Sequence, residues 1–108
     1  MRAFASLRRR ADFARLRRHG RRVTSALITV YQAKATNGQP LVGISSSRNV
    51  GGAVTRNRIR RRILSVLDEI SRGGALPGRL LVEARPAAAG ADFAQLRNEL
   101  RKAVQAPQ

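Results

Sequence analysis

The sequence contains no cysteine and no tryptophan, and its only histidine is His19. Without cysteine, disulfide bonds, cysteine-based zinc sites and a thiol nucleophile are excluded. A single histidine likewise excludes a multi-histidine metal site. No apolar run approaches the roughly 18–20 residues that a membrane-spanning helix requires, so we expect no membrane partner.

Acidic residues are also scarce: the 108 residues include 6 Asp and Glu against 22 Lys and Arg, a formal net charge of +16. All the basic residues except Lys34 and Lys102 are arginines, whose planar guanidinium binds phosphate oxygens in pairs. Codon bias in a GC-rich genome favours arginine over lysine but does not explain the excess over acids. Residues 1–22 contain one acid, Asp12, and residues 48–62 contain none. Such clusters repel themselves unless a polyanion neutralises them, so we expect a nucleic acid as partner.

Hydrophobic periodicity and turn residues predict one domain over residues 1–108, in which residues 1–9 form a basic N-terminal arm that need not be ordered without RNA. The expected elements are a helix at 12–19, strands at 23–31 and 41–47, a long helix at 53–71, a strand at 79–83 and a helix at 91–104. The first two strands flank the turn signal Asn37-Gly38 and are expected to pair as an antiparallel hairpin. The order α-β-β-α-β-α predicts an α+β fold with three helices packed on a small mixed β-sheet.

The long helix has one apolar face and one strongly basic face. Its apolar residues recur at i, i+4, i+7, i+8 and i+11, a buried stripe formed by Ile59, Ile63, Val66, Leu67 and Ile70. At roughly 100° per residue, Asn57 and Arg61 point away from the stripe, and Arg58 and Arg60 lie on opposite flanks. Arginines near a helix N-terminus oppose the helix dipole by about 0.3–1 kcal/mol each. Their presence therefore favours a role in phosphate binding over one in stability.

The segment at residues 50–63 resembles the protein component of bacterial ribonuclease P. The family pattern has an apolar residue and an alanine, then Arg-Asn-basic-apolar-basic-Arg. The residues that fill it are Val50, Ala53, Arg56, Asn57, Arg58, Ile59, Arg60 and Arg61. The chain departs from the pattern at Leu64, where the family usually has a basic residue. Residues 10–13, 42–48 and 82–86 resemble the family's first helix, the strand before its long helix and its last strand.

The resemblance implies a ribosomal protein S5 domain 2-like fold, in which a left-handed βαβ connection carries the long helix across the sheet. It implies a protein subunit of ribonuclease P, a bacterial, cytoplasmic endoribonuclease whose catalytic subunit is RNA. The protein would assist the Mg²⁺-dependent removal of the 5′ leader from precursor tRNA. The implied partners are the catalytic RNA and precursor tRNA. The Mg²⁺ is expected to be held mainly by the RNA, with no protein ligand site, and no protein homo-oligomer is expected.

The resemblance also assigns roles to individual residues. Contacts with the RNA subunit are expected from Arg48, Arg56, Asn57, Arg58, Arg60 and Arg61. Contacts with the single-stranded leader are expected from Phe13, Arg15, Arg17, Tyr31, Ser45 and Ser47. Phe13 and Tyr31 are candidates for stacking on leader bases, worth about 1–3 kcal/mol per base. A place in the hydrophobic core is the alternative for both aromatics.

We expect no catalytic residue in the protein itself. A two-metal site needs several converging carboxylates, whereas Asp68 and Glu69 are adjacent and diverge, and His19 stands alone at a helix end. Two other functions fit the charge: a ribosomal-type structural RNA-binding protein without a processing role, and a DNA-binding module. The DNA-binding module would need base-reading side chains on the exposed helix face, and an arginine-dense face favours backbone contact instead.

Overall fold

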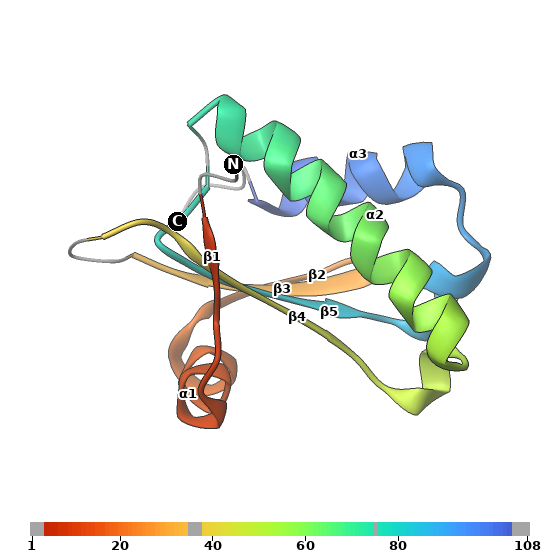
Figure 1. The fold of residues 1–108 in the computed structure, drawn as a ribbon, viewed down its shortest axis with the longest axis horizontal. Helices are drawn as coiled ribbons and strands as arrows, with labels where there is room; N and C mark the ends of the chain where they lie inside the picture. The colour runs from red at the N-terminus through yellow and green to blue at the C-terminus, as the bar shows by residue number, and fades with distance from the viewer. Residues whose placement is uncertain (1–3, 35–37, 75, 105–108) are drawn as a thin grey trace.

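The computed structural model describes residues 4–34, 38–74 and 76–104. In chain order the elements are β1 (Ala5–Ser6), α1 (Arg10–His19), β2 (Arg21–Thr24), β3 (Ile28–Ala33), β4 (Leu41–Ser46), the 3-10 helix η1 (Arg48–Val50), α2 (Ala53–Arg72), β5 (Arg79–Ala84), the 3-10 helix η2 (Pro86–Gly90) and α3 (Phe93–Val104). The strands form one mixed sheet in the order β1-β4-β5-β3-β2. Figure 1 shows α1 on one face of this sheet and α2 with α3 on the other. The predicted α+β architecture is confirmed.

The centre of the sheet is β5, and this corrects the predicted hairpin. β5 pairs parallel with β4 on one side and antiparallel with β3 on the other. The hairpin expected between the strands at 23–31 and 41–47 is therefore wrong, since β5 separates β3 from β4. A turn signal indicates where the chain reverses, not which strands become neighbours. The central place goes to the strand whose Leu80, Leu81 and Val82 are all fully buried, as expected for a strand covered on both faces.

The region predicted as one strand at 23–31 is in fact two strands. β2 and β3 pair antiparallel, from Arg21 opposite Gln32 to Thr24 opposite Thr29, and the chain reverses between them. A side chain of α3 holds this reversal, because Glu99 Oε1 accepts a hydrogen bond from the backbone N–H of Leu27 at 3.0 Å and another from the Ser25 hydroxyl. The run of β-branched residues does not predict this reversal, because the residue that holds it, Glu99, is distant in the sequence.

The connection from β4 through α2 to β5 has the handedness that the resemblance implies. β4 and β5 are parallel neighbours, with Leu41 opposite Arg79 and Ser46 opposite Ala84. In Figure 1 both strands run from left to right, β4 lies nearer the viewer than β5, and α2 passes above them. This arrangement is a left-handed crossover, the opposite of the usual rule for parallel strands.

Two apolar clusters hold the layers together. The predicted stripe of α2 is confirmed: Ile59, Ile63, Val66, Leu67 and Ile70 are all buried and pack against the sheet and α3. The second cluster is smaller and lies under α1. Its buried members are Leu7, Leu16 and Leu81, with Phe13, Tyr31, Ala33 and Leu41 packed around them. Because the second cluster is small, α1 covers only part of its face of the sheet.

Part of the predicted N-terminal arm belongs to this folded unit. β1 pairs parallel with the start of β4, and the backbone N–H groups of Ala5 and Leu7 donate to the carbonyls of Pro40 and Val42 at 2.9 Å. Phe4 and Leu7 are buried. Residues 1–3 lie outside the described residues. Apolar side chains thus fix residues 4–7, although the sequence around them is dominated by charge.

Candidate nucleic-acid interface

The N-terminal half of α2 is positioned by a short, strongly bent connection from β4. Val50 is buried and anchors η1. Gly51 follows with a φ of 148°, a conformation that suits glycine. A Cβ at Gly51 would also lie 3.1 Å from the Thr55 side chain. The chain can therefore turn directly from the sheet into α2 and place the first turns of this helix beside the end of β4.

Six residues around this bend form what we call the arginine surface: Arg48, Arg56, Asn57, Arg58, Arg60 and Arg61. All are exposed except Arg56, which is half-buried. The ion pairs among the described residues are Arg17–Glu83, Arg72–Asp68, Arg97–Glu69 and Arg101–Glu69. No arginine of the arginine surface takes part in them. All six Asp and Glu side chains of the chain lie within the described residues, and because none of them pairs with these arginines, this surface is free to bind a polyanion.

The arginine surface includes a shallow groove beside the sheet. Arg56, Asn57 and Arg60 line it from α2, and Ile44 and Ser46 line it from β4, around a volume of about 190 Å³. Arg56 Nε is buried and has no hydrogen-bond partner within the described part of the chain. A buried donor without a partner is costly. Arg56 would have to move for an outside acceptor, such as a phosphate oxygen, to reach its Nε from this groove.

The far flank of α2 is occupied by contacts within the chain. Arg58 donates to the carbonyl of Ala89 at 3.3 Å, and Arg62 donates to that of Ala91 at 3.4 Å. Leu64 is half-buried and packs against the main core. The position at which the chain departs from the family pattern is therefore part of the packing. Arg62 points toward the segment after η2 and does not replace the missing basic residue.

On the opposite face of the sheet, Phe13 of α1 lies directly over Gly43 of β4. A Cβ at Gly43 would be 2.8 Å from Phe13 Cε1 and 2.9 Å from Cζ, so only glycine lets the ring approach this closely. Phe13 and Tyr31 are both half-buried and pack against the cluster under α1. Each aromatic thus contributes to the core while keeping part of its surface open.

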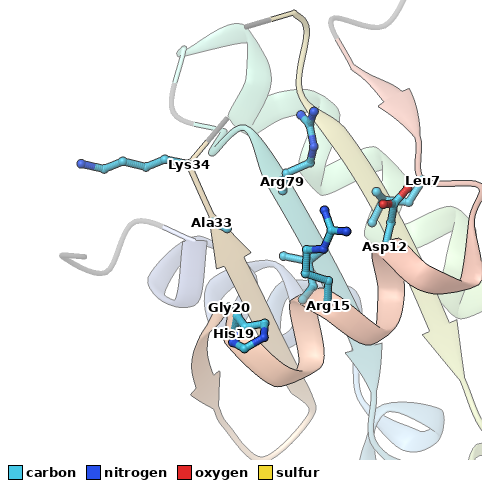
Figure 2. Close-up of a pocket in the computed structure, with 9 residues that line it drawn as sticks. Leu7, Asp12, Arg15, His19, Gly20, Ala33, Lys34 and Arg79 are labelled. Carbon is cyan, nitrogen blue, oxygen red and sulfur yellow. The ribbon is translucent and has the colours of Figure 1, made fainter. Parts of the chain in front are cut away.

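The predicted leader-binding residues Arg15 and Arg17 lie on opposite flanks of α1. Arg17 donates from Nε and Nη2 to Glu83 Oε2 at 3.0 and 2.9 Å, and its guanidinium carbon is 6.0 Å from the centre of the Phe13 ring. Arg15 instead lines a cavity of about 290 Å³ with Asp12, His19 and Arg79. In Figure 2 the Arg15 guanidinium lies among the lining residues, whereas Lys34 extends away from them. The structure therefore separates Arg15 from Arg17 and Phe13, which were predicted to bind the leader together.

A row of polar residues crosses the sheet on the Arg17 flank of α1. Ser45 of β4 is opposite Glu83 of β5, Glu83 is opposite Thr29 of β3, and Thr29 is opposite Thr24 of β2. The Thr24 and Thr29 hydroxyls are 3.4 Å apart. Ser47 is exposed and immediately precedes η1, so this row leads toward the arginine surface. Sequence reasoning missed Glu83, although alternation along β5 places it on the same face as Leu81.

The remaining acids serve other elements of the chain. Asp92 Oδ1 caps the start of α3 by accepting from the backbone N–H of Gln95 at 2.7 Å. Hydrogen bonds from Arg101 and Arg97 lower the pKa of Glu69 on α2. Within the described residues, no three His, Asp or Glu side chains gather closely enough to hold a metal ion. No α-helix there is long and apolar enough to cross a membrane.

Comparison with known proteins identifies close sequence relatives. A family model described as Ribonuclease P matches residues 1–108. The ribonuclease P protein component of Acidothermus cellulolyticus is 44% identical over 97 residues, which cover 86% of this chain and 79% of the relative. The protein component of Streptomyces bikiniensis is 40% identical, covering 92% of this chain and 88% of the relative. That of Mycobacterium tuberculosis is 32% identical, covering 94% and 87%.

Solved structures agree with the sequence relatives. The Staphylococcus aureus RNase P protein superimposes with a TM-score of 0.82 at 28% identity, covering 93% of this chain and 92% of that protein. The RNase P protein of Thermotoga maritima has a TM-score of 0.80 at 23% identity, covering 95% and 97%, and supports the fold alone. Because the family model spans the whole sequence and the relatives align over most of their length, the chain belongs to the family of bacterial ribonuclease P protein components.

Proposed function

We propose that this chain assists a catalytic RNA subunit in the Mg²⁺-dependent endonucleolytic removal of the 5′ leader from precursor tRNA in the bacterial cytoplasm. The observation that carries the proposal is the arginine surface, whose cations have no acidic partner among the described residues. Uncompensated cations on a fixed scaffold bind a phosphate backbone through the release of its counterions. The chemistry itself belongs to the RNA, and the protein contributes affinity.

The arginine surface is the proposed contact with the RNA subunit. The exposed members are Arg48, Asn57, Arg58, Arg60 and Arg61, and Arg56 lines the groove between α2 and β4. Phosphate oxygens would accept from the donors of this surface. Placing positive charge among RNA phosphates also reduces their mutual repulsion, which lowers the Mg²⁺ concentration that the folded RNA needs.

The proposed contact with the leader is the face of the sheet beside α1, which we call the leader track. It consists of Phe13, Arg17, Tyr31, Ser45 and Ser47. Half-exposed aromatic rings beside small hydroxyl side chains provide a stacking surface for single-stranded RNA. Arg15 lies on the other flank of α1, so it extends the track only for a leader long enough to cross that helix. The track and the arginine surface adjoin near Ser47 and Arg48, which would let one RNA assembly contact both.

The test is cleavage of a precursor tRNA at low Mg²⁺ by a bacterial ribonuclease P RNA, with and without this protein. We expect the protein to stimulate cleavage, and to raise substrate affinity more for a precursor with a long leader than for one with a single leader nucleotide. The absence of stimulation would favour a structural RNA-binding protein. Equal effects on the affinity for both precursors would show that the protein does not bind the leader.

A further inference from the structure

Glu83 is an unusual residue for its place in the molecule. It is one of six acids in a chain of net charge +16, and it lies in the polar row that crosses the sheet beside the leader track, between Ser45 and Thr29. Asp68, Glu69, Asp92 and Glu99 all make contacts on the α2 and α3 side of the sheet. Asp12 lines the cavity on the other flank of α1. Glu83 alone places a negative charge where a leader would lie.

The geometry leaves half of the Glu83 carboxylate available. Both hydrogen bonds from Arg17 end on Oε2, at 3.0 and 2.9 Å. Within the described residues, Oε1 has no hydrogen-bond partner. The Glu83 side chain is 27% exposed and that of Arg17 is 42% exposed. An exposed ion pair of this kind contributes little to folding stability, so it does not by itself explain an acid at this position.

We propose that Glu83 determines base specificity on the leader track: its Oε1 accepts a hydrogen bond from the exocyclic amino group of a leader base. The inference rests on the proposed function, because it requires a leader on this face of the sheet. A carboxylate repels phosphates, so the backbone of the leader must lie over the neighbouring cations and turn a base toward Glu83. Carboxylates that read bases accept from amino groups, as from N4 of cytosine. Uracil presents a carbonyl oxygen at the same position, which the carboxylate repels.

Arg17 is a positioning residue in this arrangement. Its two donors fix the orientation of the Glu83 carboxylate, and its guanidinium remains beside the ring of Phe13. A base stacked at Phe13 would therefore meet a fixed acceptor at its edge. Cytosine and uracil offer the same ring for stacking and differ at the amino or carbonyl group, so comparing them isolates the hydrogen bond.

The experiment is a competition between two precursor tRNAs in one reaction, one with a leader of cytidines and one with a leader of uridines of equal length. The ratio of their cleavage rates gives the ratio of kcat/KM and does not depend on how much protein is active. The same ratio measured for the RNA subunit alone, at high Mg²⁺, gives the baseline preference of the RNA for one leader over the other. Relative to that baseline, we expect the complete enzyme to prefer the cytidine leader by roughly 5–10-fold.

The variant Glu83→Gln tests the residue, since its amide is a weaker acceptor and can donate to the uracil carbonyl. We expect the cytidine preference to fall to the baseline. The matched control is Glu69→Gln, which removes one arginine-paired carboxylate on the other side of the sheet and should keep the preference. Equal preference in Glu83→Gln and the unmodified protein would overturn the inference. So would equal gains for both leaders, which would mean that Glu83 merely repels RNA. No protein-dependent stimulation with either leader would instead overturn the proposed function.

Discussion

The two halves of α2 carry the same kind of cation in opposite circumstances. In the C-terminal half, Arg72 pairs with Asp68 at 3.1 Å, and Glu69 accepts from Arg97 and Arg101 of α3 at 2.9 Å. In the N-terminal half, the arginines from Arg56 to Arg61 form no ion pair with the acids of the chain. One half is electrostatically complete within the protein, and the other requires a partner.

We propose that this difference separates the half of α2 that only stabilises the fold from the half that also binds RNA. The buried stripe of α2 runs through both halves, from Ile59 to Ile70, so packing does not distinguish them. The N-terminal cations also oppose the helix dipole. If this position were selected for stability alone, acids would be expected there. The start of α3 shows that arrangement, because Asp92 caps it. The unpaired positive charge therefore marks the half of the helix that we propose to bind RNA.

The largest effect is expected when cations are removed from the unpaired N-terminal half of α2. For Arg58, Arg60 and Arg61 changed together to Ala, we expect affinity for the RNA subunit to fall about 10²-fold, since each exposed ionic contact contributes up to about 1 kcal/mol. The melting temperature should change little, because these exposed side chains form no ion pairs and the only hydrogen bond described for them is the exposed one from Arg58 to the Ala89 carbonyl. Equilibrium binding and thermal unfolding measure the two effects.

The matched control removes the same number of charges from the paired side. With Arg72, Arg97 and Arg101 changed to Ala, we expect a slightly lower melting temperature, since exposed ion pairs contribute little, and an RNA affinity within a few-fold of the unmodified protein. If both triple variants weaken RNA binding equally, only the total charge matters and the comparison between the halves fails.

A smaller effect is expected at Gly43, which tests the open face of the sheet separately from α2. In Gly43→Ala the new Cβ would meet the Phe13 ring at 2.8–2.9 Å, and forcing the ring to move costs about 1–3 kcal/mol of stability. Leader-dependent affinity should fall as Phe13 shifts, whereas affinity for the RNA subunit should not.

Gly90→Ala is the control for this substitution, because a Cβ at Gly90 meets nothing within 4 Å. Chemical denaturation and binding of precursors with long and short leaders would measure both consequences. A leader-dependent affinity unchanged in Gly43→Ala would show that the position of Phe13 is not important for leader binding.

The smallest expected effect concerns Glu69, where hydrogen bonds from Arg101 and Arg97 lower the pKa of the carboxyl group. Because the folded-state pKa lies below the unfolded value, this contribution is present at neutral pH and is lost as the pH falls through the folded pKa. Glu69→Gln should therefore melt slightly below the unmodified protein at pH 7. The difference should shrink as the pH falls below the usual pKa of glutamate, about 4.3. Thermal unfolding between pH 3 and 7 would measure it, and a difference independent of pH would contradict this account.

The features that the sequence predicts well are those that repeat along one helix. The spacing from Ile59 to Ile70 predicts the buried face of α2, and the same spacing places Asn57 and Arg61 away from it. A contact of the same local kind is the hydrogen bond of 2.7 Å from the backbone N–H of Gln95 to Asp92 Oδ1 at the start of α3. These patterns need only neighbours within a few residues, so periodicity is sufficient to find them.

The features that the sequence does not predict depend on distant partners. The reversal between β2 and β3 is held by Glu99, and the central place of β5 separates two strands that adjoin in the sequence. The pairing of Arg17 with Glu83 joins residues from α1 and β5. Strand alternation places Glu83 on its face, but only the folded chain shows which helix lies beside it.

The most direct test of the central claim is the salt dependence of binding to the RNA subunit. The slope of log K against log salt concentration counts the phosphates that the protein neutralises, at about 0.7–0.9 per contact. We predict that the slope becomes shallower by about 2–3 when Arg58, Arg60 and Arg61 are all replaced by Ala. It should stay unchanged when Arg72, Arg97 and Arg101 are replaced. Equal slopes for the unmodified protein and the first variant would contradict the assignment of the arginine surface to RNA.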